Sequence, residues 1–303
     1  MSLSITNAFV EQYRNNVTML TQQRGSKLRD FVTVNNGVVG KTVFTEQIGA
    51  TEAKKRISRH GDSPLVDTPH KRRLYTMADY EWGDLIDKAD RVRMLIDPTS
   101  TYAQSAAFAM GRVMDDVVID ALKGDASIED AGSQTTVSLS QTVAKTFNDV
   151  NSGNDSVLNI AKLRQAQQLF HTANVPDDEE KFIVVSPKGI QQLLGAKEVT
   201  SSDFNTVKAL VNGEIDTFMG FRFIVSNRLP ISSNDRDAFA FTRSAIELGI
   251  GQDVMARIEE RADKAFSTYV YYCMTLGATR LEEEKVVKIT YDESDNVDKS
   301  ATI

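Results

Sequence analysis

The chain has 303 residues, of which 41% are hydrophobic and 25% charged, with a net charge of −7 and one cysteine, Cys273. These values are ordinary for a globular protein, and a single cysteine excludes an intramolecular disulfide. We expect no membrane partner, because no apolar run reaches the roughly 18 residues of a membrane-spanning helix, and the first residues lack the basic and apolar regions of a secretory signal.

The charge is unevenly divided along the chain. Residues 1–73 carry 12 Lys or Arg against 6 Asp or Glu, and residues 74–303 carry 23 against 36, which gives net charges of +6 and −13. A basic end and an acidic body suit head-to-tail contacts between copies, and such contacts build rings and open lattices.

The first 93 residues predict an arm and a hairpin. A narrow apolar stripe indicates a short helix over residues 8–20, and Asn35-Asn36-Gly37 predicts a turn. Residues 38–93 have the pattern of a long two-stranded excursion with few large apolar side chains at its tip. Because an isolated hairpin is marginally stable in water, we expect it to lie on another surface.

The clearest helix is predicted over residues 97–124. Asp97 is the expected N-cap, Pro98 suits the first turn, and Gly124 suits the end. One side of this helix is apolar from Tyr102 to Ala121. The expected wet side is marked by Arg112, Asp115, Asp116 and Asp120.

A loop-like stretch over residues 125–154 is expected next, with one short strand over 135–139. A compact α/β region follows, in which Ser186-Pro187 predicts the start of a helix. Its expected helices cover residues 156–173 and 187–194, and its expected strands cover 181–185, 217–226 and 238–248. Further strands are expected over 255–261, 267–276 and 284–291, before a frayed tail. We expect Cys273 to be a small buried hydrophobe.

This order of elements resembles that of the major capsid proteins of tailed bacteriophages, which have the HK97-type capsid fold. The resemblance covers nearly the whole chain and rests on element order and sequence texture, because the family has no invariant chemical motif. The local sequences that carry it are residues 74–82, 90–98, 102–122, 182–187 and 220–230.

The resemblance implies an α+β, HK97-like fold in five parts. They are an N-terminal arm (1–37), an extended β-hairpin loop, or E-loop (38–90), a peripheral domain (91–154) with a spine helix (97–124), an α/β axial domain (155–250), and peripheral β-strands with a C-terminal tail (251–303). In this family the extended loop lies over an adjacent subunit, and the axial domains meet around fivefold and sixfold axes.

The function that the resemblance implies is self-assembly into the icosahedral head shell of a virion, which encloses packaged double-stranded DNA. The implied partners are copies of the chain in pentamers and hexamers, a portal protein, and DNA held without sequence-specific contact. Since residues 1–37 are too few for the removable scaffolding segment of some relatives, a separate scaffolding protein is expected. A decoration protein stays open, and assembly is expected in the host cytoplasm.

Charge division and resemblance together predict that the basic loop of one subunit lies on the acidic body of the next. The predicted basic residues are Lys54, Lys55, Arg56, Arg59, Lys71, Arg72 and Arg73. The predicted acidic acceptors are Asp115, Asp116, Glu259, Glu260, Glu282, Glu283 and Glu284. Each exposed pair contributes only about 0.2–1 kcal/mol, and many copies make such contacts cooperative. A solvated loop without a partner is the alternative.

No catalytic residue, cofactor or metal site is expected. Residues 282–284, taken as part of a strand, alternate between its faces and do not converge on a metal. Gly249-Ile250-Gly251 is too short for a dinucleotide-binding turn, and Ser186 lacks the context of a nucleophile. The basic tract lacks the interleaved aromatic residues that stack on nucleic-acid bases. Lys54, Lys55 and Lys71 could in form crosslink to a neighbour's Asn, as in some relatives, but ordinary solvated lysines are favoured.

Two alternatives remain from the sequence. An encapsulin-like nanocompartment subunit shares the fold but holds cargo protein, and the long loop and arm favour the phage instead. A cytosolic enzyme built on residues 155–250 would need convergent titratable residues, which the sequence does not show, and it would purify as a small oligomer rather than as shells or capsomers.

Overall fold

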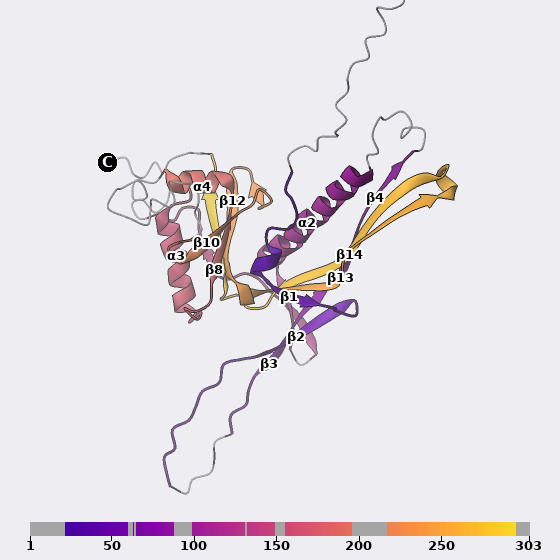
Figure 1. Cartoon of the computed structure of the whole chain (residues 1–303). Coiled ribbons are helices and arrows are strands. Elements are labelled where there is room, and N and C mark those ends of the chain that lie inside the picture. The colour runs from indigo at the N-terminus through magenta and orange to yellow at the C-terminus, as the bar shows by residue number, and fades with distance from the viewer. Residues whose placement is uncertain are drawn as a thin grey trace, which may run out of the picture.

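The computed structural model describes residues 22–59, 63, 65–87, 99–130, 132–148, 155–195 and 217–294. Within these ranges the chain forms three β-sheets and the helices α2, α3 and α4, and a long hairpin loop leads away from the body (Figure 1). The predicted arm helix over residues 8–20 lies outside the described residues, as do Asp97 and Pro98.

The first sheet is covered on one face by the long helix α2 (Thr99–Lys123), which confirms the predicted helix over its described part. The strand order is β1-β13-β14-β4, and the bounds are β1 (Thr33–Asn36), β13 (Ile246–Arg261), β14 (Ser267–Arg280) and β4 (Ala78–Ile86). Met114 and Val118 of α2 pack into one core with Val270 and Met274 of β14. The β13–β14 ribbon continues outward past this core (Figure 1).

The second sheet has helices α3 (Ile160–Thr172) and α4 (Pro187–Leu194) against one face. The strand order is β7-β15-β12-β8-β10-β9, and the bounds are β7 (Thr142–Val143), β15 (Val286–Asp292), β12 (Asp235–Thr242), β8 (Lys181–Val185), β10 (Phe221–Val225) and β9 (Thr217–Phe218). A short strand β11 (Ile231–Ser232) pairs with β12.

Successive residues of β8 enter different cores. Phe182 and Val184 join the core of α2, whereas Ile183 and Val185 join the core of α3 and α4. This is the alternation that a strand buried on both faces requires. The second sheet is therefore the wall between the two cores, and it fixes α2 relative to α3 and α4.

The third sheet carries the hairpin. Its strand order is β2-β3-β5-β6, and the bounds are β2 (Thr42–Ile48), β3 (His70–Thr76), β5 (Ala126–Asp130) and β6 (Ser133–Val137). The antiparallel pairing of β2 with β3 confirms a two-stranded excursion, but over residues 42–76. The prediction that it extends to residue 93 is wrong, because residues 78–86 form β4 and pair with β14 in the first sheet. Short 3₁₀ turns η2 (Arg29–Phe31), η3 (Arg243–Ala245) and η4 (Ala262–Lys264) join other elements.

Ser186 is the N-cap of α4, as predicted, and its hydroxyl accepts from the amide of Gly189 at 3.0 Å. The predicted start of α3 at Ser156 is wrong. The Ser156 hydroxyl donates to the carbonyl of Lys145 at 2.8 Å, and the cap is Asn159.

Several strand expectations are also wrong. Residues 126–130, expected in a loop, form β5. The sequence did not predict this strand because it is half-exposed and largely polar. The expected strand over 238–248 is interrupted by η3, where the chain passes from the second sheet to the first. Residues 282–284 lie in a turn, and β15 begins at Val286 and pairs with β12, so the last strand belongs to the sheet of the α/β region. The named domains and their limits remain predictions.

Asp115 fastens the segment that leads in from residue 22 to helix α2. It is fully buried, and its carboxylate accepts from the amides of Lys27 at 2.9 Å and Leu28 at 3.1 Å and from the Ser26 hydroxyl at 2.6 Å. One turn earlier, a Cβ at Gly111 would lie 2.4 Å from the carbonyl carbon of Gly25, so the crossing requires glycine.

The prediction that Asp115 lies on the wet side of the helix and accepts from a neighbouring subunit is therefore wrong. Periodicity places Asp115 on a helix face, but it does not reveal that the chain's own N-terminal segment covers that face.

Asp115→Ala tests this anchor. We expect it to lower the unfolding free energy of the unassembled subunit by about 3 kcal/mol, because buried amides lose a charged acceptor. Denaturant unfolding measures the loss, and the exposed Asp120→Ala on the same helix is the control. Equal stability of the two variants would contradict the anchoring role.

Candidate inter-subunit surfaces

The base of the hairpin rests on the first sheet through Tyr75 of β3. Its ring lies over Gly249 and Gly277, which are register partners on β13 and β14. A Cβ at Gly249 would come within 2.4 Å of the Tyr75 hydroxyl oxygen, and one at Gly277 within 2.9 Å of ring carbon Cδ2. Only glycine lets the ring approach the sheet this closely, because real Cβ atoms do not tolerate such contacts.

Glu247 joins four strands at the same place. This buried carboxylate accepts from the Tyr75 hydroxyl at 3.1 Å, from Thr45 Oγ1 at 2.7 Å and from Asn35 Nδ2 at 3.0 Å. Burial, and then the Glu247 carboxylate, raise the pKa of Tyr75, so the hydroxyl remains a donor. Strands β1, β2 and β3 are thereby fixed to β13.

A buried ion pair fixes strand β3 at Arg73, two residues before Tyr75. Arg73 is 3% exposed, and its guanidinium donates to Glu283 and, at 3.2 Å, to Gln47. Arg280, fully buried, lies 3.6 Å from Glu283 and donates to the carbonyl of Gly124 at the end of α2 at 2.8 Å.

The prediction that Arg73 and Glu283 meet a neighbouring subunit is wrong, since they pair with each other inside one chain. Arg73 lies two residues from Tyr75 on the same strand face and therefore points into the body.

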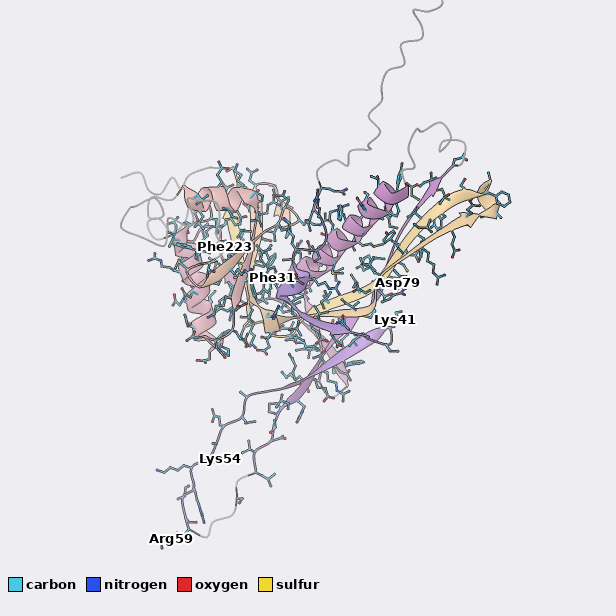
Figure 2. All side chains as sticks on the ribbon, in the orientation of Figure 1. Phe31, Lys41, Lys54, Arg59, Asp79 and Phe223 are labelled. Carbon is cyan, nitrogen blue, oxygen red and sulfur yellow. The ribbon has the colours of Figure 1, made fainter. Side chains whose placement is uncertain are left out.

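The tip of the hairpin has no such anchorage. The amide of Gly49 donates to the carbonyl of Pro69 at 2.9 Å, and every residue from 50 to 59 beyond it is exposed. Lys54 and Arg59 lie far from the body (Figure 2). Ile57 is 99% exposed and Leu65 94% exposed, which is unusual for large apolar side chains.

The other predicted basic residues occupy two regions. Lys54, Lys55, Arg56 and Arg59 lie in the tip, and Arg56 donates to the carbonyl of Ser58 at 2.8 Å. Lys71 and Arg72 are exposed on β3, and Arg72 lies 3.5 Å from Glu46.

The predicted acidic acceptors do not form one cluster. Asp116 pairs with Arg228, and Glu282 lies 3.4 Å from Lys285. Glu284 is exposed in the turn before β15. Glu259 and Glu260 lie on β13 beyond the core, and as successive strand residues they point to opposite faces. The structure therefore leaves several separate carboxylates rather than one acidic site.

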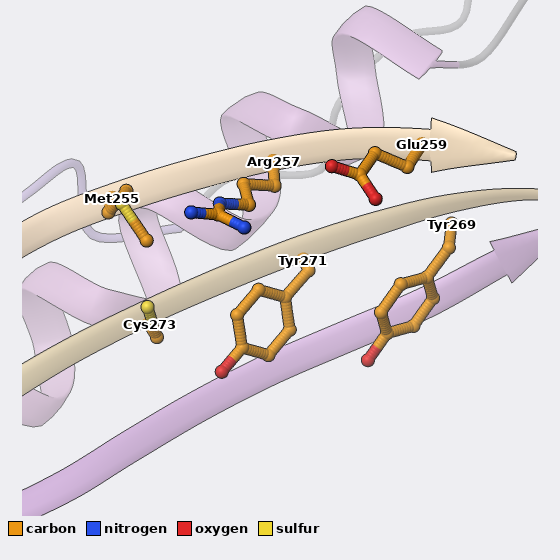
Figure 3. A pocket seen from close by; sticks show the side chains of 6 residues that line it. All are labelled: Met255, Arg257, Glu259, Tyr269, Tyr271 and Cys273. Atoms are coloured by element: carbon orange, nitrogen blue, oxygen red, sulfur yellow. The ribbon is translucent and has the colours of Figure 1, made fainter.

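A shallow hollow of about 430 Å³ opens on the β13–β14 ribbon, on the face opposite α2 (Figure 3). It is lined by Met255, Arg257, Glu259, Tyr269, Tyr271 and Cys273. The two tyrosine rings stack with centroids 5.9 Å apart. Sequence reasoning missed this surface and expected Cys273 to be buried, whereas it is partly exposed. A strand that is apolar on both faces, as residues 269–274 are, was the available signal.

Within the described ranges, no group of three His, Cys, Asp or Glu side chains could hold a metal ion. No helix there is long and apolar enough to cross a membrane.

The family model described as phage capsid protein matches residues 5–293 of this chain. The chain belongs to the phage capsid protein family. The match covers the arm, the hairpin, all three sheets and both cores, as the resemblance implied.

Solved structures of phage capsids share the fold. The capsid of cyanophage P-SCSP1u has a TM-score of 0.72 at 15% identity, covering 96% of this chain and 95% of that one. The capsid of cyanophage Pam1 has a TM-score of 0.69 at 14% identity, covering 96% and 98%. The acidic stable capsid of Helicobacter pylori bacteriophage KHP30 has a TM-score of 0.69 at 11% identity, covering 94% and 95%. No curated protein matches the sequence significantly.

The chain is a major capsid protein of a tailed phage and forms the head shell, with the α+β, HK97-like fold that the resemblance implied. The family is one of structural proteins that assemble from many copies of one chain.

The packing of the Tyr75 ring on Gly249 can be tested by a double-mutant cycle. We expect Gly249→Ala to cost about 1–3 kcal/mol of unfolding free energy through overpacking against the ring. Tyr75→Ala should remove that penalty in the double variant, because the three atoms nearest to an added Cβ at Gly249 all belong to Tyr75. Gly277→Ala is the control, since its Cβ would also meet the backbone oxygen of Thr76 at 2.7 Å and keeps its penalty. Additive effects of Gly249→Ala and Tyr75→Ala would contradict this packing of the ring on the sheet.

Proposed function

We propose that each capsid subunit uses the hairpin to hold a neighbouring subunit in the shell. The observation that carries this proposal is the contrast between its two ends. The base is fixed by Tyr75, Glu247 and the Arg73–Glu283 pair, whereas residues 50–59 are all exposed. A fixed base aims the loop before any partner arrives, and this lowers the entropic cost of binding.

Charge favours a contact between copies. The tip carries Lys54, Lys55, Arg56 and Arg59, and the exposed carboxylates of Glu259 and Glu284 belong to the acidic part of the chain. Asp116 and Glu282 already have partners within their own subunit, so they are weaker candidates. Each exposed pair contributes about 0.2–1 kcal/mol and is screened by salt. Weak contacts let a misplaced subunit leave, and a closed shell adds many of them together.

The finer parts of the proposed function rest on the family resemblance. The shell is built from pentamers and hexamers and encloses double-stranded DNA without sequence-specific contact, which the acidic body of the chain favours. Assembly takes place in the host cytoplasm with a portal protein. The chain works through its interfaces and turns over no substrate.

Charge reversal at the tip tests the proposal. We expect Lys54→Glu/Lys55→Glu to reduce the yield of shells at least several-fold and to raise the subunit concentration needed for assembly, while the unfolding temperature of the free subunit stays unchanged. Sedimentation of expressed protein measures shell yield. Lys123→Glu/Lys188→Glu, an equal charge change on α2 and α4, is the control. Arg73 is left intact because it is buried. Normal shell yield with unchanged salt sensitivity would refute the proposal.

A further inference from the structure

Strand β6 (Ser133–Val137) is an edge of the third sheet, since among the described residues it pairs only with β5. It has no charge and no proline, and residues 133–136 are exposed. Edge strands usually carry charges, prolines or bulges that prevent pairing with another chain. The edge strand β4 follows this rule with Asp79, Glu81 and Asp84. Strand β6 does not, and it is the longest uncharged edge strand in the described part of the chain.

Two hydrogen bonds at the hairpin base fix which residues of β3 bond to β2. The amide of Met77 donates to the carbonyl of Lys41 at 2.8 Å. The amide of Gly49 donates to the carbonyl of Pro69 at 2.9 Å. These bonds continue the β2–β3 ladder at its two ends, and both join odd-numbered residues. Since successive residues of a strand direct their backbone groups to alternate sides, the odd-numbered residues of β3 bond to β2 and the even-numbered residues bond to β5.

The same alternation determines which backbone groups of β6 are open. Residues 72 and 74 of β3 lie opposite residues 129 and 127 of β5, so these odd-numbered residues of β5 bond to β3. The even-numbered residues of β5 then bond to their partners in β6, which are Ser133, Thr135 and Val137. The N–H and C=O groups of Gln134 and Thr136 consequently point away from the sheet, toward its open edge.

We propose that β6 pairs antiparallel with β6 of a second copy of the chain, across a twofold axis at Thr135. In this register Gln134 of each copy lies opposite Thr136 of the other, and each such pair exchanges both of its backbone hydrogen bonds. The edge is thus complementary to itself, as a twofold contact requires. A charged residue at the axis would face its own like charge, whereas threonine opposite threonine is a favourable cross-strand pair.

This contact goes beyond the proposed function, because it involves neither residues 50–59 nor an ion pair. The chain belongs to a family that assembles from many copies, so a second copy is the partner present wherever a shell forms. The pairing joins the third sheets of two subunits into one continuous sheet. Such a small contact is weak by itself, and it adds to the hairpin contact only when both form in the same shell.

Thr135→Cys/Cys273→Ser tests the axis directly. Residues at the axis form a non-hydrogen-bonded pair with Cα atoms about 4.5 Å apart, which a disulfide can bridge. We expect mild oxidation of shells to give disulfide-linked dimers on a non-reducing denaturing gel, at least tenfold more than in the matched control Thr136→Cys/Cys273→Ser. Position 136 is exposed on the same strand, but its two copies would lie roughly 9 Å apart in this register. Absence of dimers from Thr135→Cys/Cys273→Ser shells, or equal dimer formation by the two variants, would overturn the proposal.

The unmodified protein supplies a second measurement if Thr135→Cys/Cys273→Ser does not assemble. In shells made from this chain alone, we expect the amides of Gln134 and Thr136 to exchange hydrogen at least tenfold more slowly than in free subunits. The amides of Ser133 and Thr135 should be protected in both states, because they already bond to β5. Unchanged exchange at Gln134 and Thr136 would rule out the pairing. Neither measurement depends on the hairpin tip, so the outcome of Lys54→Glu/Lys55→Glu decides the proposed function separately.

Discussion

The contact of Tyr75 with the paired glycines Gly249 and Gly277 decides where the hairpin leaves the body. Without side chains at these two positions, an aromatic ring lies directly on the sheet, and its hydroxyl reaches the buried carboxylate of Glu247. The ion pair of Arg73 with Glu283 fixes the same strand to the body two residues before Tyr75. Together these contacts turn a hairpin that would be marginal alone into a rigid base with a defined direction.

The packing that stabilises the subunit and the surfaces proposed for assembly lie in different parts of the molecule. The second sheet separates two apolar cores, and helix α2 and the first sheet pack together in one of them. The hairpin tip and the outer end of the β13–β14 ribbon extend beyond both cores (Figure 1). The surfaces that we propose to bind a neighbour can therefore be altered without disturbing the packing that folds the subunit, and weak contacts between such extensions would suit a shell that must correct its own errors.

Local signals were sufficient for much of the fold. The period of α2, the cap of α4 at Ser186 and the alternating residues of β2 are properties of short segments. The failures share a different cause. Asp115 is buried by a segment almost 90 residues away, and Arg73 by one more than 200 residues away, so neither partner is visible in the local pattern. The pairing of β15 with β12 and the open tyrosine face of β14 likewise depend on which strands become neighbours.

Hydrogen exchange in free subunits and in assembled shells tests the central claim most directly, because it reports base and tip in one experiment. The account requires residues 70–76 to be protected in both states, and residues 50–59 to exchange rapidly in the free subunit and slowly in the shell. Protection of residues 50–59 already in the free subunit, or rapid exchange of the same residues in the shell, would contradict a hairpin whose base is fixed to its own subunit and whose tip is bound by a neighbouring subunit.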